Sequence, residues 1–199
     1  MEAQPTLICI PDISGFTRFM SETAFELNSK VVTSLLNQII YSNNIGLKIS
    51  EIEGDAVLFF KSGELPSLNN LLKQCNRFYL EFYDQMRKLH SKFSDRDGSE
   101  KIPEILGLKI IMHYGESIGE VAVGKNIKLM GEDVIVAHRL LKNNLVLDEY
   151  VLISEKLWEE YSRNCSKNQK FMKQFRKGKI NTEHIGTINF YYKDLRPLL

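Results

Sequence analysis

Residues 7–17 have the sequence LICIPDISGFT, in which a carboxylate stands where an apolar run gives way to a glycine. Residues 6–13 form the short apolar run that is typical of a buried strand. Gly15 permits the tight turn that would follow, and we expect a helix from there to about Ser21. The sequence therefore predicts that Asp12 is held at the end of a rigid strand, beside the start of a helix.

A second carboxylate, Asp55, occurs in a similar setting within residues 48–60, KISEIEGDAVLFF. We expect strands over residues 47–53 and 55–61, joined by a tight turn at Gly54. Two carboxylates held on rigid strand ends are suitable ligands for a Mg²⁺ ion that serves phosphates. The alternative is that both are ordinary turn residues, because Asp is favoured in turns for its hydrogen bonds to the backbone.

The rest of the chain alternates between helical and strand periodicity in a mixed order. Long helices separate some strands and short hairpins join others, so we expect an α+β fold, a ferredoxin-like sandwich with helices packed on a mostly antiparallel sheet. A single domain, residues 1–199, is predicted, with a core over about 6–155 and a C-terminal helix and strand over about 155–195. The expected elements are helices at 24–44, 67–92, 132–141 and 155–163, strands at 105–114, 117–124, 151–153 and 185–192, and a polar loop at 94–103.

The composition is that of an ordinary globular protein, with 43% hydrophobic and 26% charged residues in a chain of 199. A net charge of +1 argues against a general nucleic-acid surface, and we interpret the local basic tract at 167–179 as solvated. The three cysteines, Cys9, Cys75 and Cys165, have no CxxC spacing, which fits a reducing compartment and predicts no zinc site. Since no basic leader or apolar run of ~20 residues occurs, we expect no membrane span and a cytoplasmic protein.

Four segments of the chain resemble, in the same order, the catalytic domain of class III nucleotidyl cyclases, the adenylyl and guanylyl cyclases. The match covers about residues 6–155, with a weaker one at 185–192, and is most similar to an uncharacterised, divergent bacterial branch of that superfamily. The segments are IPDISGFT at 10–17, similar to the first metal-binding motif; EIEGDA at 51–56, similar to the second; the strand and turn at 107–119; and MGEDVIVAHRL at 130–140, similar to the helix that supplies transition-state contacts.

The resemblance implies that Asp12, Asp55 and the carbonyl of Ile13 bind two Mg²⁺ or Mn²⁺ ions, which in turn hold a nucleoside triphosphate. In the family the ribose 3′-hydroxyl attacks the α-phosphorus and pyrophosphate leaves. A helix that starts after the first carboxylate presents free N–H groups, which bind phosphate oxygens. The residues at that helix start are Ser14, Gly15, Phe16 and Thr17.

The family's active sites form between two subunits, so the resemblance also implies a homodimer with composite sites. Arg139 matches the transition-state arginine, whose guanidinium can neutralise charge on the phosphoryl oxygens. The alternative is a surface arginine in an ion pair. Ile135 stands where the family has a ribose-orienting asparagine, and Ile185 where a loose alignment places its triphosphate lysine.

The sequence leaves open which residues replace these groups and what the base-selecting positions do. Lys142 and Asn143, or Lys177 and Lys179, lie where they can approach the same phosphates. Glu51 stands where adenylyl cyclases have lysine and guanylyl cyclases have glutamate, and Lys128 where the family has aspartate or cysteine. These two residues either recognise a purine edge, guanine fitting the carboxylate, or form an ion pair that fills the purine pocket.

The sequence thus favours a divergent cyclase-like domain that binds a purine nucleoside triphosphate and a divalent metal. Losing one preorganised transition-state donor typically costs ~10²–10³ in kcat, so we expect weak, altered or absent cyclase activity. The alternative is a catalytically inactive nucleotide-binding module for regulation or dimerisation in bacterial signalling. Whether the protein is an enzyme stays open at this point.

Overall fold

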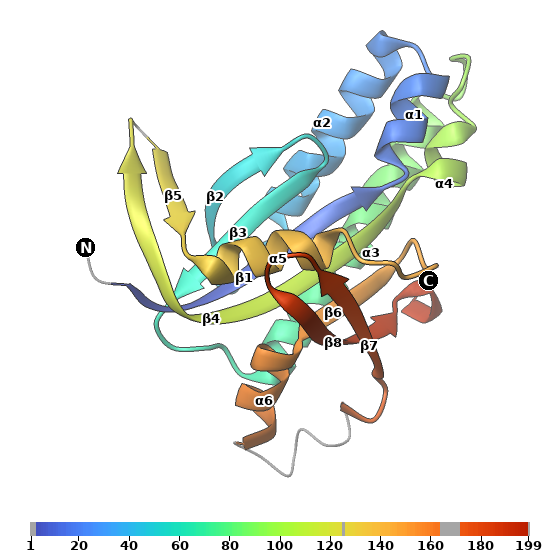
Figure 1. The fold of residues 1–199 in the computed structure, drawn as a ribbon. Coiled ribbons are helices and arrows are strands. Elements are labelled where there is room, and N and C mark those ends of the chain that lie inside the picture. Colours follow the sequence, from blue (N-terminus) through green and yellow to red (C-terminus); the bar gives the residue numbers. More distant parts are fainter. Residues whose placement is uncertain (1–2, 125, 164–171, 199) are drawn as a thin grey trace.

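The computed structural model describes residues 3–124, 126–163 and 172–198 (Figure 1). The strands are β1 (Gln4–Ser14), β2 (Lys48–Glu53), β3 (Ala56–Ser62), β4 (Gly107–Val123), β5 (Asn126–Met130), β6 (Tyr150–Ser154), β7 (Arg176–Thr182) and β8 (Gly186–Asp194). The helices are α1 (Phe16–Glu22), α2 (Phe25–Tyr41), α3 (Leu68–Lys92), α4 (Lys101–Ile105), α5 (Glu132–Leu141) and α6 (Glu155–Arg163), with a short 3₁₀ turn at Arg196–Leu198.

One mixed sheet joins all the strands of the described residues, in the order β2-β3-β1-β4-β6-β8-β7, with β5 paired to β4 off this path. Every pairing is antiparallel except β4 with β6, which is parallel. In Figure 1, α5 crosses one face of the sheet and α3 lies behind the other. The predicted α+β fold, with helices packed on a mostly antiparallel sheet, is confirmed.

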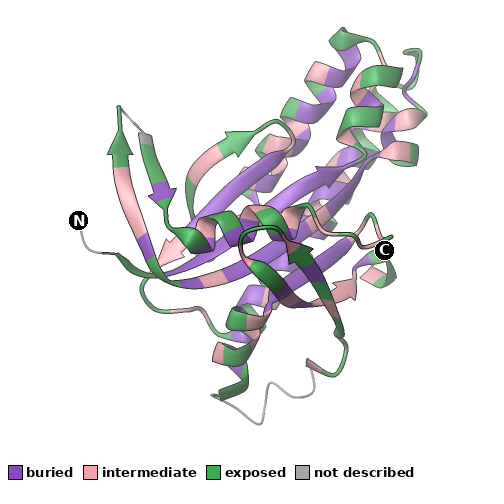
Figure 2. Cartoon of the chain, viewed as in Figure 1, coloured by how far each residue is buried: buried purple, intermediate pink, exposed green. Residues whose placement is uncertain are grey.

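β1 lies near the centre of the sheet and is buried on both faces (Figure 2). Leu7, Cys9 and Ile13 point into a core shared with α1, α2 and α3, whereas Ile8 and Ile10 point into a second core beneath α5. A strand covered on both faces has no polar side to expose, which is why its sequence is a continuous apolar run. Its end is therefore one of the most firmly fixed points of the molecule.

Two parts of the fold differ from the sequence-based expectation around Gly115. Strand β4 runs without a break for 17 residues, where two strands with a turn were expected. A Cβ on Gly115 would lie 2.4 Å from Cβ of Asp133, so this glycine makes room for α5 and does not mark a turn. The far end of β4 then pairs with β5, a strand that the sequence analysis missed.

Two smaller differences concern the polar and C-terminal segments. The expected loop at 94–103 ends in the short helix α4, and β7, which pairs with β8, was not predicted. Cys9 and Cys75 are free and buried, whereas Cys165 and the beginning of the basic tract lie outside the described residues. Among the helices that the structure describes, none is long and apolar enough to cross a membrane.

The turn between β1 and α1 provides a direct test of the fold. We expect Gly15→Ala to lower the free energy of unfolding by about 2–5 kcal/mol, because overpacking adds to the strain of a left-handed L-residue. A Cβ there would lie 2.1 Å from the carbonyl oxygen of Ile105, at a φ of +77°. Urea denaturation measures the change.

Gly46→Ala is the matched control, because Gly46 has a φ of +72° but no atom within 4 Å of an added Cβ. It should lose only the backbone strain, about 1–2 kcal/mol. Equal losses in the two variants would contradict the packing of Gly15 against α4.

Candidate functional site

A backbone hydrogen bond brings the two predicted carboxylates together. The N–H of Ile13 donates to the carbonyl oxygen of Asp55 at 3.0 Å, and the strand register pairs Asp12 with Ala56. The turn that precedes β3 is thus fastened to the end of β1. Asp12 and Asp55 consequently lie close enough for the charge of one to perturb the other.

Asp12 is a buried carboxylate with an incomplete set of partners. Its side chain is only 7% exposed; Oδ2 lies 3.3 Å from Nζ of Lys109, and Oδ1 has no hydrogen-bond partner. Burial raises the pKa of Asp12 to about 7, with Asp55 raising it further and the Lys109 ammonium lowering it. Such an oxygen, beside a second carboxylate, is the kind of group that a cation would satisfy.

These residues fit a Mg²⁺ or Mn²⁺ ion that depends on its substrate for further ligands. The donor set is the two carboxylates and the nearby carbonyl of Ile13. The described part of the chain has no cluster of three or more His, Cys, Asp or Glu residues that would hold a metal by itself. Mg²⁺ typically binds through one or two carboxylates, several waters and substrate phosphates, so a sparse protein set suits it.

The start of α1 lies next to this pair. Gly15 is its N-cap, no side chain caps the helix, and its first turn carries no acidic residue. Gly15 and Thr17 are exposed and Phe16 is half-buried, whereas Ser14 is buried and donates its hydroxyl to the carbonyl oxygen of Asp148 at 2.5 Å. The Ser14 hydroxyl is thus already engaged at this helix start.

Glu51 and Lys128 form an ion pair, one of the two arrangements left open by the sequence. Nζ of Lys128 donates to Oε2 of Glu51 at 2.7 Å, and Nε2 of His138 lies 3.9 Å from Oε1. Strand β5 makes this contact possible, since it lies beside β2, where Ser50 Oγ donates to the carbonyl of Ile127 at 3.4 Å. Because Lys128 is half-exposed, solvent screens the pair, and it can open for a ligand.

A surface pocket of about 380 Å³ extends from Glu51 to Asp55. It lies between the β2–β3 hairpin and the C-terminal half of α5, and both Glu51 and Asp55 line it. The sequence analysis did not assign the pocket residues Glu53 and His138 to the site; the position of His138 next to Arg139 was the feature that could have indicated it. The full lining is Ile10, Glu51, Glu53, Asp55, Ala56, Leu58, His138, Leu141 and Lys142.

Arg139 lies apart from the carboxylates, on a different pocket between α5 and the β7–β8 hairpin. It is exposed and makes no ion pair within the described ranges, so the alternative of a surface ion pair finds no support there. Lys142 is also exposed and lines both pockets. Ile135, four residues before Arg139, is 53% exposed. The single chain therefore gathers Asp12, Asp55 and Glu51 but not Arg139.

Two of the residues considered as substitutes are already engaged. The Asn143 amide donates to the carbonyl of Leu140 and the hydroxyl of Tyr150, both at 2.7 Å, and accepts the N–H of Leu145. Lys177 pairs with Glu155 at 3.2 Å. Asn143 thus has a structural role just after α5. Of the two neighbours, Lys142 is the one whose side chain is exposed and free to approach a ligand.

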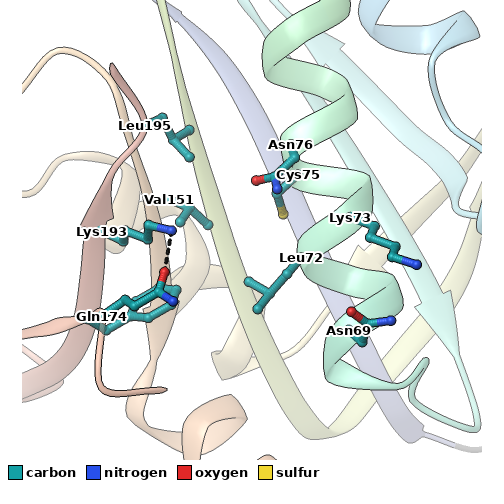
Figure 3. Close-up of a pocket in the computed structure, with 10 residues that line it drawn as sticks. Asn69, Leu72, Lys73, Cys75, Asn76, Val151, Gln174, Lys193 and Leu195 are labelled. Carbon is teal, nitrogen blue, oxygen red and sulfur yellow. Dashed lines mark hydrogen bonds between the residues drawn. The ribbon is translucent and has the colours of Figure 1, made fainter. Parts of the chain in front are cut away.

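A further pocket lies on the opposite face of the sheet, between α3 and strands β6 and β8 (Figure 3). Leu72 and Val151 contribute apolar surface, and Lys193 donates to Gln174 at 2.6 Å across its edge. Since α3 covers the face of the sheet away from α5, this pocket takes no part in the carboxylate site.

Solved structures with the same architecture are catalytic domains of nucleotidyl cyclases. The guanylyl cyclase Cya2 has a TM-score of 0.64 at 16% identity, covering 96% of this chain and 93% of its own. The adenylyl cyclase CyaB from P. aeruginosa has 0.60 at 17%, covering 96% and 95%. The guanylate cyclase domain of RhGC from Catenaria anguillulae, in complex with GTP, has 0.58 at 15%, covering 96% and 97%. The fold is that of this class of domain.

The chain belongs to the family described as "protein of unknown function (DUF2652)", whose model matches residues 32–150. The uncharacterized protein Rv2561/Rv2562 from Mycobacterium tuberculosis is 31% identical over 112 residues, which are 55% of this chain and 51% of that protein. The chain thus spans about half the length of this curated relative.

The raised pKa of Asp12 predicts how stability depends on pH. Because folding raises this pKa from 3.8 to about 7, the folded protein binds the proton more tightly than the unfolded chain. The contribution of Asp12 is therefore full below 3.8 and is lost as the pH rises through about 7. In metal-free protein we expect the unfolding free energy to fall, relative to Asp12→Asn, by up to about 4 kcal/mol between about pH 4 and pH 8.

Urea denaturation in EDTA across this pH range measures the effect. Asp95→Asn, at an exposed carboxylate, is the control and should keep the wild-type profile. Parallel profiles for the wild type and Asp12→Asn would contradict the burial of an incompletely partnered carboxylate.

Proposed function

We propose that the protein binds a purine nucleoside triphosphate together with Mg²⁺ or Mn²⁺, as a homodimer with composite sites and with weak, altered or absent cyclase activity. The whole chain, residues 1–199, acts as one domain in this proposal. One observation carries it: the buried carboxylate of Asp12 keeps an oxygen without a partner next to a second carboxylate, Asp55. A protein that uses its fold only for association has no need of such a costly pair.

Asp12, Asp55 and the Ile13 carbonyl would hold the metal, and the backbone N–H groups from Gly15 to Thr17 would contact phosphate oxygens. When bound, a divalent ion neutralises phosphate charge and lowers the pKa of a ribose hydroxyl. The complex of the Catenaria anguillulae domain with GTP supports a nucleotide as the ligand class. The pocket that joins Asp55 to Glu51 provides the adjoining space for a base.

Arg139 supports the composite site. In a homodimer the exposed guanidinium of one subunit would reach the nucleotide held by the carboxylates of the other, with Lys142 beside it. Exposed apolar side chains on β2, β5 and α5 supply a surface for such an association. They are Ile49, Ile52, Ile127, Met130 and Ile135.

A second candidate is a regulatory or dimerisation module that binds nucleotide without turnover. It is favoured by Ile135, an exposed apolar residue at the asparagine position, and by the Glu51–Lys128 ion pair in the base-selecting positions. Both candidates share the metal and nucleotide site and differ only in whether a cyclic product forms.

Nucleotide binding tests the shared part. We expect calorimetric titration with ATP or GTP in Mn²⁺ to give saturable binding that Asp12→Asn and Asp55→Asn each weaken at least about tenfold, since each removes one metal ligand. Asp95→Asn should bind as the wild type does. Failure of the wild type to bind either nucleotide, or unchanged binding by Asp12→Asn, would overturn the proposal.

Complementation between subunits tests the composite site and separates the two candidates. Asp12→Asn and Arg139→Gln should each abolish the cyclic product, whereas a mixture should recover about a quarter of the wild-type rate, because half of the randomly formed dimers carry one intact site. Arg87→Gln, at an exposed arginine of α3, is the control for Arg139→Gln. A folded, nucleotide-binding wild type without product would select the regulatory module. Where the wild type does form product, a mixture no more active than its components would rule out the composite site.

A further inference from the structure

A separate cavity of about 190 Å³ lies between the N-terminal half of α5, the start of α6 and strand β8. It shares no residue with the pockets that hold Asp55 and Arg139. Three apolar side chains, Val136, Ile185 and Ile188, form part of its wall. The other lining residues are polar or charged: His113, Glu132, Ser154, Glu155, Lys156, Thr187 and Asn189.

His113 is a buried hydrogen-bonding group with one nitrogen left over. Its side chain is 1% exposed; Nε2 lies 3.1 Å from Oδ1 of Asp133, whereas Nδ1 is buried without a partner. Burial lowers the pKa of His113, so the ring is neutral near pH 7. Pairing with a carboxylate assigns the hydrogen to Nε2 and leaves Nδ1 as an acceptor. A buried acceptor without a donor is costly, and His113 is one of the residues that line the cavity.

Most of the other charged groups at the cavity form ion pairs or hydrogen bonds with neighbouring side chains. Nζ of Lys156 donates to Asp133 at 2.6 Å. Glu155 accepts from Lys177 at 3.2 Å and from Asn189 at 2.8 Å. Each cation in these contacts is therefore balanced by a neighbouring carboxylate.

Two acceptors remain for a ligand. Glu132 is exposed and makes no ion pair within residues 3–124, 126–163 and 172–198. The second acceptor is Nδ1 of His113. Ser154, which also lines the cavity, accepts the N–H of Leu157 at 3.3 Å. These two acceptors favour a ligand that donates hydrogen bonds and carries positive charge.

We propose that this cavity binds a short aliphatic amine, whose ammonium group donates to Nδ1 of His113 and is balanced by Glu132. Its hydrocarbon stem lies against Val136, Ile185 and Ile188. At roughly 30 Å³ for each water-sized unit, the volume suits a molecule of about six non-hydrogen atoms. None of the cavity's residues is among those proposed to hold the metal or the nucleotide, and of them only Ile185 stands at a position that the resemblance connects with the triphosphate.

Calorimetric titration of the full chain with n-butylamine, sodium n-butyrate and 1-butanol at about pH 8 tests the proposal, because an alkylamine keeps its proton at this pH. We expect butylamine alone to bind, with a Kd on the order of 1 mM for so small a ligand. Glu132→Gln should weaken it about tenfold, the effect of losing one charge partner. Ile185→Trp, which fills the rim, should abolish binding while Glu132 remains.

Glu64→Gln is the matched control, because Glu64 is an exposed carboxylate elsewhere and its loss changes the net charge equally. Running the titrations in EDTA on Asp12→Asn separates this site from the nucleotide site, and binding should persist there. Binding of butyrate or butanol as tight as that of butylamine, no binding at all, or equal weakening by Glu132→Gln and Glu64→Gln would each overturn the proposal. If Nα-acetyl-lysine amide bound more tightly than butylamine, the site would be assigned to a lysine side chain of a protein, and the proposal of a free aliphatic amine would be overturned.

Discussion

The hydrogen bond from the Ile13 N–H to the Asp55 carbonyl is the contact on which the candidate site depends. It fastens the turn before β3 to the end of β1, a strand buried on both faces. The two carboxylates are thereby placed side by side by backbone alone, without relying on flexible side chains. The position of Gly15 against α4 fixes the other flank, where α1 begins.

This arrangement is electrostatically unfavourable in the protein by itself. Burial and the neighbouring Asp55 both oppose the charge of Asp12, and the single ammonium of Lys109 offsets only part of this. A divalent cation would coordinate the Asp12 carboxylate directly, in place of the proton on this carboxyl or the Lys109 ammonium beside it. The site thus gives up stability in the metal-free protein, which is the usual price of a preorganised binding site.

The local elements that create the site were predictable from the sequence. The apolar run into Asp12, the glycines at the two turns and the 3.6-residue period of α5 each determine their own structure. The ion pair of Glu51 with Lys128 was only one of two arrangements that the sequence left open, because the two residues are 77 positions apart and strand β5, which brings them together, was not predicted. Glu51 meets Lys128 only because β4 continues through Gly115 and pairs with β5. A glycine inside a strand looks like a turn unless the helix packed over it is known.

The cavity between α5, α6 and β8, for which we propose an amine ligand, also could not be predicted from the sequence. His113 and Asp133 lie 20 residues apart in the chain, and they form their hydrogen bond because α5 packs onto β4. Their sequence context has no metal or catalytic spacing, so only the structure reveals the unpartnered nitrogen. In a family without an assigned function, such buried and incompletely matched groups identify sites that a motif comparison passes over.

The most direct test of the account is the anomalous diffraction of crystals grown with Mn²⁺ and a non-hydrolysable purine nucleoside triphosphate analogue. The account predicts a manganese peak between the carboxylates of Asp12 and Asp55, bridged to the phosphates at the start of α1. Nucleotide bound elsewhere, or bound without manganese at these two carboxylates, would contradict it.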